Sequence, residues 1–239
     1  MKTSQRSRTS VRPCTSLQTG LFATELDLVE AIQKAFKTGS STTWAWLTEL
    51  DSPSGIADLV AIKRRSLNGT TSIATLPPRW AYILKCLPFQ QSFSLPWFSE
   101  AFSTTPSYAR GMLQLYVQAG FCTQNSRDKT WAKTQEPQPI AEKIVAVEAK
   151  LRDWRRALYQ ASRYLDYAGE SWVVLEHVAL AAALDHIEEF ARRGVGLIGL
   201  SRKGSIEIAS QSSERAPRML SRFWHANAEI ARRLQPSSL

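Results

Sequence analysis

The sequence predicts an α/β fold that is interrupted by a small, mostly helical segment. After residue 140 the hydrophobic pattern alternates between strand and helix, which is the order expected when helices cover a sheet. Before residue 65, two short apolar segments flank a turn signal and predict a hairpin that joins the same sheet. Between these regions, short helical patterns follow Pro77 and Pro78, so this middle segment is predicted to be an insertion.

The first part of the sheet-forming region is expected to span residues 21–75, after a disordered basic tail over residues 1–20. That tail is rich in Ser and Thr and lacks the apolar stretch of a secretory signal. A helix is predicted from about Glu25 to Phe36, where apolar residues recur at helical spacing. Strands are predicted over 43–47 and 56–62, on either side of a Ser-Pro-Ser-Gly turn.

The insertion is expected to span residues 76–134 and to resemble a winged helix-turn-helix domain. Three short helical patterns followed by two short strands give the element order of such a domain. Pro106 suits the first turn of the third helix, and Gly120 suits its end. The predicted elements are helices over 79–87, 95–102 and 107–119, and strands over 121–124 and 129–133.

Residues 135–239 are expected to complete the sheet-forming region and to end in a basic amphipathic helix. A linker with two prolines, residues 135–140, separates this part from the insertion. The predicted strands are 144–148, 171–175, 195–200 and 205–209, and the predicted helices are 152–166, 179–193 and 217–233.

The overall charge favours an anionic partner. The chain carries 30 Lys and Arg against 21 Asp and Glu, a formal net charge of +9, and nucleic acid is the commonest partner of such a surplus. A basic surface that serves only solubility is the alternative. Cys14, Cys86 and Cys122 lie far apart and are odd in number, which fits neither a zinc site nor a disulfide framework and favours a reducing cytoplasm. No apolar run approaches the roughly 20 residues that span a bilayer, so no membrane association is expected.

Two carboxylates and one lysine carry the chemistry that the sequence predicts. Glu148 and Lys150 are two residues apart on a predicted strand, so their side chains project from the same side. Asp58 lies on a predicted strand that can bring it beside them. Mg²⁺ binds one or two carboxylates together with phosphate oxygens and water, and an adjacent lysine can orient or deprotonate water or stabilise developing charge. The trio therefore predicts metal-dependent hydrolysis of a phosphodiester.

At these residues the chain resembles the PD-(D/E)xK, or restriction-endonuclease-like, nuclease superfamily. Asp58 matches the family's aspartate, with Ala57 in place of the proline that often precedes it. Glu148-Ala-Lys150 matches the family's E-x-K motif in full.

Two further features extend the resemblance over about residues 20–65 and 140–210. Gln160 and Tyr164 are similar to the Gln-x-x-x-Tyr motif of several branches, in which the glutamine lies near the active site. The family also often has an acidic residue on its first helix that helps to hold metal. Glu25 is the best match for that residue, and Glu30 is the second.

The resemblance implies a restriction-endonuclease-like mixed central sheet flanked by helices, and a Mg²⁺- or Mn²⁺-dependent endodeoxyribonuclease. It implies that Asp58, Glu148 and Glu25 hold the metal. Lys150 would act on the attacking water or on the transition state, and Gln160 would assist.

The winged-helix-like insertion and the helix after the E-x-K motif are expected to contact DNA. Basic side chains supply phosphate contacts, and the third helix of a winged helix can contact bases. The expected nucleic-acid-binding residues are Tyr108, Arg110, Gln114, Arg127, Lys129, Lys133, Arg152, Arg155 and Arg156.

Structural explanations remain open for each of these residues. Glu-x-Lys on a strand is often an exposed ion pair worth under about 1 kcal/mol. Asp58 can serve a turn, Glu25 can favour a helix N-terminus, and Gln160 can pack on the sheet. Winged helices also bind proteins, and the arginines also suit a solvated helix face.

At the level of the whole protein, two alternatives to a nuclease are open. The first is a catalytically silent DNA-binding or assembly subunit, and the second is a winged-helix transcription regulator. A homodimer or a larger nucleoprotein complex is compatible with the sequence, which requires neither.

Overall fold

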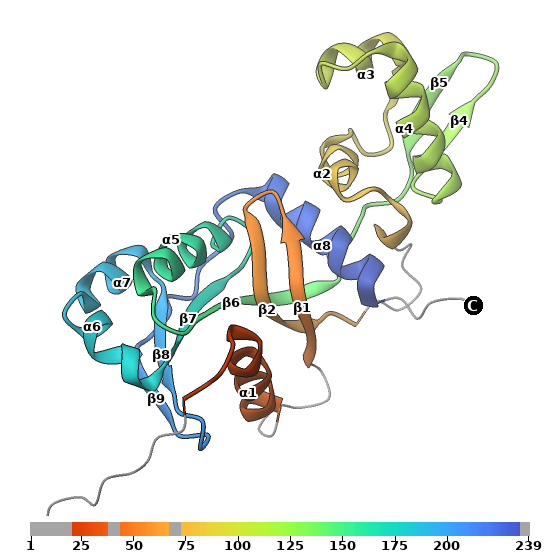
Figure 1. Cartoon of the computed structure of the whole chain (residues 1–239). Helices are drawn as coiled ribbons and strands as arrows, with labels where there is room; N and C mark the ends of the chain where they lie inside the picture. The colour runs from red at the N-terminus through yellow and green to blue at the C-terminus, as the bar shows by residue number, and fades with distance from the viewer. Residues whose placement is uncertain (1–20, 38–43, 67–72, 235–239) are drawn as a thin grey trace, which may run out of the picture.

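The computed structural model describes residues 21–37, 44–66 and 73–234 and has a mixed α/β architecture. A six-stranded mixed sheet is flanked by helices, and a second region of helices and three short strands stands beside it (Figure 1). The α/β fold class predicted from the sequence is confirmed. The basic tail over residues 1–20 lies outside the described residues.

The large sheet has the strand order β1-β2-β6-β7-β8-β9. The hairpin β1–β2 pairs with β6 in antiparallel fashion, β6, β7 and β8 run parallel, and β9 returns antiparallel at the edge. The predicted hairpin therefore joins the predicted α/β segment in one sheet. The strands are β1 (Trp44–Ser52), β2 (Gly55–Arg64), β6 (Ala141–Lys150), β7 (Glu170–Glu176), β8 (Gly196–Leu200) and β9 (Ile206–Ser210).

Helices cover both faces of this sheet. On one face, α1 (Glu25–Lys37) buries Leu28 and Ile32 against apolar side chains of β2, β6, β7 and β8. On the other face, α5 (Trp154–Tyr164) packs against β7 and β8 together with the short helices that follow.

The prediction of one long helix over 179–193 is wrong, because this segment forms several shorter elements instead. It forms a 3₁₀ turn (His177–Ala179), α6 (Leu180–Leu184) and α7 (Ile187–Arg193). The break allows Leu180, Ala183 and Phe190 to enter the same core, and Gly194, with φ of 73°, ends α7 in the left-handed conformation.

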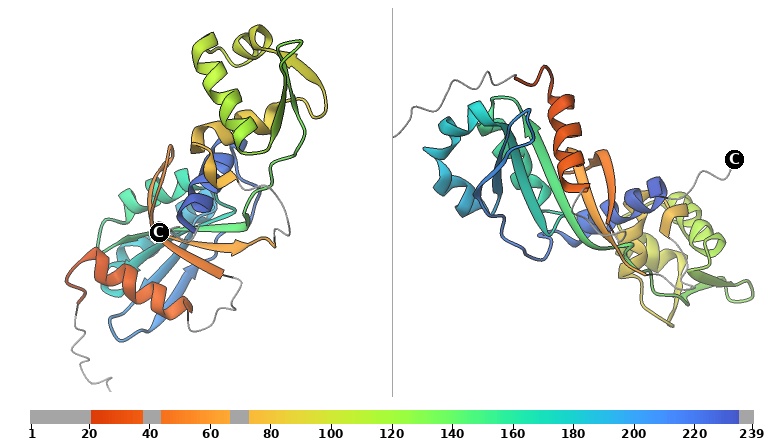
Figure 2. Two further views of the ribbon diagram at one scale, coloured as in Figure 1. Left: turned by 90° about the vertical axis from the view of Figure 1, so that its right-hand side faces the viewer. Right: turned by 90° about the horizontal axis from the view of Figure 1, so that it is seen from below.

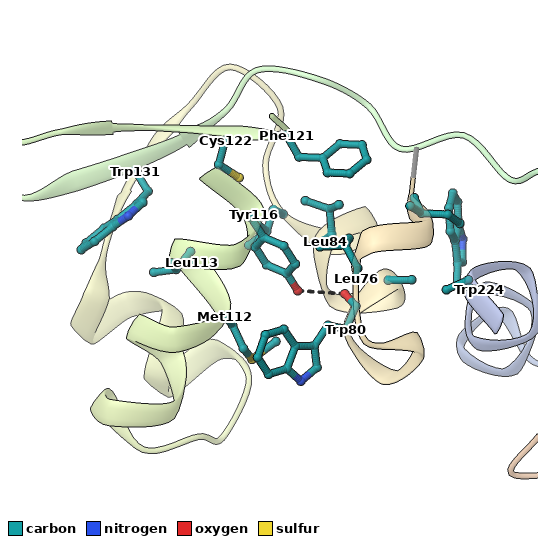
Figure 3. Close-up of a cluster of buried hydrophobic side chains, with 14 of the residues drawn as sticks. Leu76, Trp80, Leu84, Met112, Leu113, Tyr116, Phe121, Cys122, Trp131 and Trp224 are labelled. Atoms are coloured by element: carbon teal, nitrogen blue, oxygen red, sulfur yellow. Dashed lines mark hydrogen bonds between the residues drawn. The ribbon is translucent and has the colours of Figure 1, made fainter. Parts of the chain in front are cut away.

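The inserted region has its own core. Helices α2, α3 and α4 pack with the three-stranded sheet β3-β5-β4 around Trp80, Phe98, Met112 and Tyr116. The buried Tyr116 hydroxyl donates a hydrogen bond of 2.8 Å to the carbonyl of Trp80 (Figure 3). The elements are α2 (Pro78–Cys86), β3 (Ser92–Ser94), α3 (Leu95–Ala101), α4 (Pro106–Gln118), β4 (Cys122–Asn125) and β5 (Thr130–Lys133), after a 3₁₀ turn at Ile73–Thr75.

The C-terminal helix α8 (Leu220–Leu234) lies between the insertion and the large sheet (Figure 2). Its Trp224 and Ala228 belong to the insertion core, and Figure 3 shows Trp224 reaching toward α2. Its Ala226 and Ile230 belong to a core against β2 and β6. Helix α8 therefore contributes side chains to both cores and joins the two regions.

Cys86 and Cys122 are free thiols, the first exposed and the second buried. Burial raises the pKa of the Cys122 thiol to about 12, so this thiol stays protonated. Within the described ranges, no helix is both long enough and apolar enough to cross a membrane.

Candidate active site

The candidate site lies where strands β2 and β6 stop pairing. Their antiparallel register runs from Arg64 and Ala141 as far as Leu59 and Val147. Two residues beyond Val147, the Ala149 N–H donates to Oδ2 of Asp58 at 2.8 Å. The Asp58 carboxylate thus takes the place of a backbone acceptor and is fixed between the two strands.

The ammonium group of Lys150 gathers three carboxylates around itself. Its Nζ lies 3.0 Å from Oε1 of Glu148, 3.0 Å from Oε2 of Glu25 and 3.8 Å from Oδ2 of Asp58. The four side chains come from α1, β2 and β6. The structure therefore brings Asp58, Glu148, Lys150 and Glu25 together as the sequence predicted.

Burial sets the electrostatics of the cluster. The Glu148 side chain is 1% exposed, and burial followed by repulsion from Asp58 raises the pKa of Glu148 above its ordinary value. Burial likewise raises the pKa of Asp58, against the opposing effects of the Ala149 amide and Lys150. Burial disfavours the charge of Lys150, but the surrounding carboxylates prevail and raise its pKa. The cluster thus holds three carboxylates around one lysine, more than that lysine neutralises when all three are ionised.

Tyr164 is a member of the site that the sequence analysis named only as the companion of Gln160. Its hydroxyl oxygen lies 2.6 Å from Oε2 of Glu148 and 2.6 Å from the carbonyl oxygen of Ile56. A phenol carries one proton, so it donates to one of these acceptors at a time. When Glu148 is ionised, Tyr164 donates to it and holds the carboxylate in place.

Gln160 and Glu30 are not drawn into the cluster. Gln160 lies one helical turn before Tyr164, and its Oε1 atom is buried with no hydrogen-bond partner among the described residues. Glu30 is exposed beside Gln33 and Lys34 on α1. Of the two candidates for the helix acid, the structure places Glu25 at Lys150.

Most of the predicted nucleic-acid-binding residues are exposed, whereas Tyr108 and Lys133 form hydrogen bonds within the insertion. Arg152, Arg155 and Arg156 are exposed at or near the start of α5, and the guanidinium of Arg155 lies 4.4 Å from the centre of the Trp154 ring. In the insertion, four residues are exposed on α4 and at the β4–β5 turn: Arg110, Gln114, Arg127 and Lys129. Tyr108 is 39% exposed, and its hydroxyl lies 2.6 Å from Nε1 of Trp80.

The structure contradicts the prediction that Lys133 contacts DNA. Its side chain is 1% exposed, pairs with Glu136 at 2.9 Å and donates to the carbonyl of Lys85. Because β5 is the central strand of the small sheet, Lys133 points into the insertion and offers no charge to a phosphate.

Carboxylate oxygens such as those of the site are ligands that a divalent cation can bind. Among residues 21–37, 44–66 and 73–234, no group of three or more Asp, Glu, His or Cys side chains is arranged so that it could hold a metal ion. Mg²⁺ does not require such a group, because it is commonly bound by one or two carboxylates, water and a substrate phosphate. Asp58 and Glu148 supply hard oxygen donors around the same lysine ammonium. These residues fit Mg²⁺ or Mn²⁺.

No model of a known protein family matches the chain, and no curated protein or solved structure compared with it is similar. The geometry of the described residues is therefore the basis for proposing a function.

Proposed function

We propose that this protein is a metal-dependent nuclease that hydrolyses DNA phosphodiester bonds. The observation that carries the proposal is the convergence of Asp58, Glu148 and Glu25 on the Lys150 ammonium, from three separate elements. A purely structural ion pair needs one carboxylate. Three carboxylates in a partly buried cluster are costly unless a cationic partner or a reaction uses them.

In this proposal Asp58 and Glu148 hold Mg²⁺ or Mn²⁺, and the more exposed Glu25 lies at the edge of the cluster. When bound, the ion supplies Lewis-acid polarisation of the phosphoryl group and lowers the pKa of water. Tyr164 keeps the Glu148 carboxylate oriented through its 2.6 Å hydrogen bond. The raised pKa of Lys150 favours its protonated form, so its role is to stabilise negative charge on phosphate oxygens.

The architecture supports the restriction-endonuclease-like reading of the core. The acidic residues lie on adjacent strands β2 and β6, α5 follows β6, and β7 returns parallel to it. The element order α2-β3-α3-α4-β4-β5 with its three-stranded sheet supports a winged-helix reading of the insertion. In that reading the exposed Arg110 and Gln114 of α4 face the DNA.

The test is cleavage of supercoiled plasmid by the purified chain in Mg²⁺ or Mn²⁺. Lys150→Ala and Asp58→Ala should each reduce the cleavage rate at least about a hundredfold, because each removes charge stabilisation from the reaction. Lys143→Ala is the matched control, since Lys143 also lies on β6 and pairs with two carboxylates, Glu170 and Glu214. Its cleavage rate should stay within about twofold of the unmodified protein, because it touches none of the proposed catalytic groups.

Circular dichroism must show that each variant is folded. Cutting that EDTA does not abolish, or that the folded Lys150→Ala variant retains in full, would exclude the proposed site. A protein that binds DNA tightly but cuts neither plasmid nor shorter substrates would instead be the catalytically silent subunit.

A further inference from the structure

An exposed ridge of arginines and one tyrosine runs along α5, the helix that follows the candidate site. Its members are Arg152, Arg155, Arg156, Tyr159 and Arg163. Arg152 lies just before the helix, and within α5 the spacing of Arg155 and Arg156 to Tyr159 and of Tyr159 to Arg163 is three or four residues, which places these four on one side of the helix. Figure 1 shows α5 on the outside of the large sheet, beside the β1–β2 hairpin.

The ridge carries positive charge that the described part of the protein does not neutralise. No carboxylate among the described residues forms an ion pair with any of its four arginines, whereas Lys63 and Lys143 of the large sheet each have one. Arg155 and Arg163 are eight residues apart, or about 12 Å along the helix axis. This spacing of unpaired guanidinium groups suits an extended chain of phosphates.

Tyr159 distinguishes the ridge from a solvated helix face. At 58% it is the most exposed aromatic side chain among the described residues. The guanidinium of Arg163 lies 5.9 Å from the centre of its ring. An exposed ring flanked by cations is a stacking surface for a nucleobase. A continuous duplex cannot use it, because paired bases keep their faces stacked against one another and expose only their edges.

The ridge also lies next to the proposed chemistry. Arg152 follows Lys150 by two residues, before α5 begins, and Tyr164 at the end of α5 reaches Glu148. The start of the helix is therefore linked to the site through a short stretch of chain, and its end is linked to the site through the Tyr164 hydroxyl. We propose that the α5 ridge binds a single-stranded segment of the nucleic acid beside the cleavage site, with a base stacked on Tyr159. This rests on the proposed function, and it specifies DNA with an unpaired strand as the substrate class.

The test is fluorescence anisotropy in EDTA with labelled single-stranded DNA and with a duplex of the same length. Tyr159→Ala should weaken binding of the single strand about tenfold, the usual loss for one stacked base. It should leave the duplex affinity within about twofold, and Tyr159→Trp should restore single-strand binding because it restores a ring. Phe89→Ala is the matched control, since Phe89 is 42% exposed on the insertion, and it should change neither affinity.

Equal losses on single strand and duplex would overturn the proposal in favour of a duplex-backbone surface. No loss with Tyr159→Ala on either substrate would also overturn it. Binding in EDTA does not require the metal site. A protein that keeps the Tyr159 effect but never cuts DNA would contradict only the nuclease proposal, and a protein that cuts normally without the Tyr159 effect would contradict only the ridge.

Discussion

Two lysines lie almost wholly inside this protein, and their surroundings differ. Lys133, in the insertion, is 1% exposed, and it shares the single carboxylate of Glu136 with Lys85. Lys150, in the large sheet, is 11% exposed and faces three carboxylates. The first cluster has more cations than anions and sits at the border of an apolar core. The second has a formal charge of minus two when its carboxylates are ionised.

This difference separates a structural ion pair from a candidate active site. At Lys133, the partners are hydrogen bonded and one of them reaches solvent, so the lysine is accommodated by the fold. At Lys150, the pKa values of Asp58 and Glu148 are raised, first by burial. Clusters in which folding leaves like charges together are typical of functional sites, because a fold alone has no need of them.

The largest expected effect on stability comes from replacing each buried lysine with methionine. Lys150→Met leaves three carboxylates without a cation and should cost about 3 kcal/mol at neutral pH. Lys133→Met should cost about 1 kcal/mol or less, because methionine fills similar space and Glu136 keeps Lys85 at 3.0 Å. Chemical denaturation of both variants measures the two values.

The loss of stability in Lys150→Met should itself depend on pH. Carboxylates whose pKa is raised by folding contribute stability at low pH that is lost as pH rises through the raised pKa. The deficit of Lys150→Met should therefore shrink as pH falls toward the ordinary carboxyl values of 3.8 for Asp58 and 4.5 for Glu148. A deficit that is the same at acidic and neutral pH would mean that the carboxylates do not repel one another.

The next effect concerns Tyr164, whose hydroxyl hydrogen bond lowers the pKa of Glu148 against the larger, opposing effect of burial. Tyr164→Phe removes that hydrogen bond and should move the acidic limb of the pH–rate profile to higher pH. At neutral pH it should reduce the cleavage rate about tenfold, because Glu148 loses its orientation. Tyr82→Phe, on α2 of the insertion and away from the site, is the control. An unmoved acidic limb would show that Tyr164 only fills space.

The smallest effect concerns the surface of the insertion. Arg110→Ala should weaken duplex binding severalfold and reduce the dependence of log K on log salt concentration by about one unit, as expected for one lost phosphate contact. Lys133→Met should leave that slope unchanged, because Lys133 is buried. Titrations at several salt concentrations measure both slopes, and equal slopes for all three proteins would remove α4 from the DNA-binding surface.

Much of the fold could be predicted because local patterns agree with the tertiary structure. The apolar spacing of Leu28 and Ile32 matches the buried face of α1, and the turn before Gly55 matches the β1–β2 hairpin. The strand β3 was missed, because three residues around Phe93 are too few to show a period. The break between α6 and α7 was missed because packing onto one core decided it, and neither Gly nor Pro marks the position.

The site was predicted from residue types, but its contacts were not. The two-residue spacing of Glu148 and Lys150 predicts that their side chains lie on the same side of the strand, because side chains alternate along a strand. The contact of Tyr164 with Glu148 joins positions sixteen residues apart through the crossing of α5 over the sheet. The burial of Lys133 depended on β5 being central in a sheet whose third strand left no sequence signal.

The measurement that tests the central claim most directly is Mn²⁺ binding by isothermal calorimetry, without DNA. The account predicts that the unmodified protein binds Mn²⁺ and that Glu148→Gln weakens this binding at least about tenfold, because it removes a charged ligand from a buried site. Glu142→Gln, on the same strand but 50% exposed, should bind as the unmodified protein does. Equal Mn²⁺ affinity in Glu148→Gln and the unmodified protein would contradict the assignment of a metal site to Asp58 and Glu148.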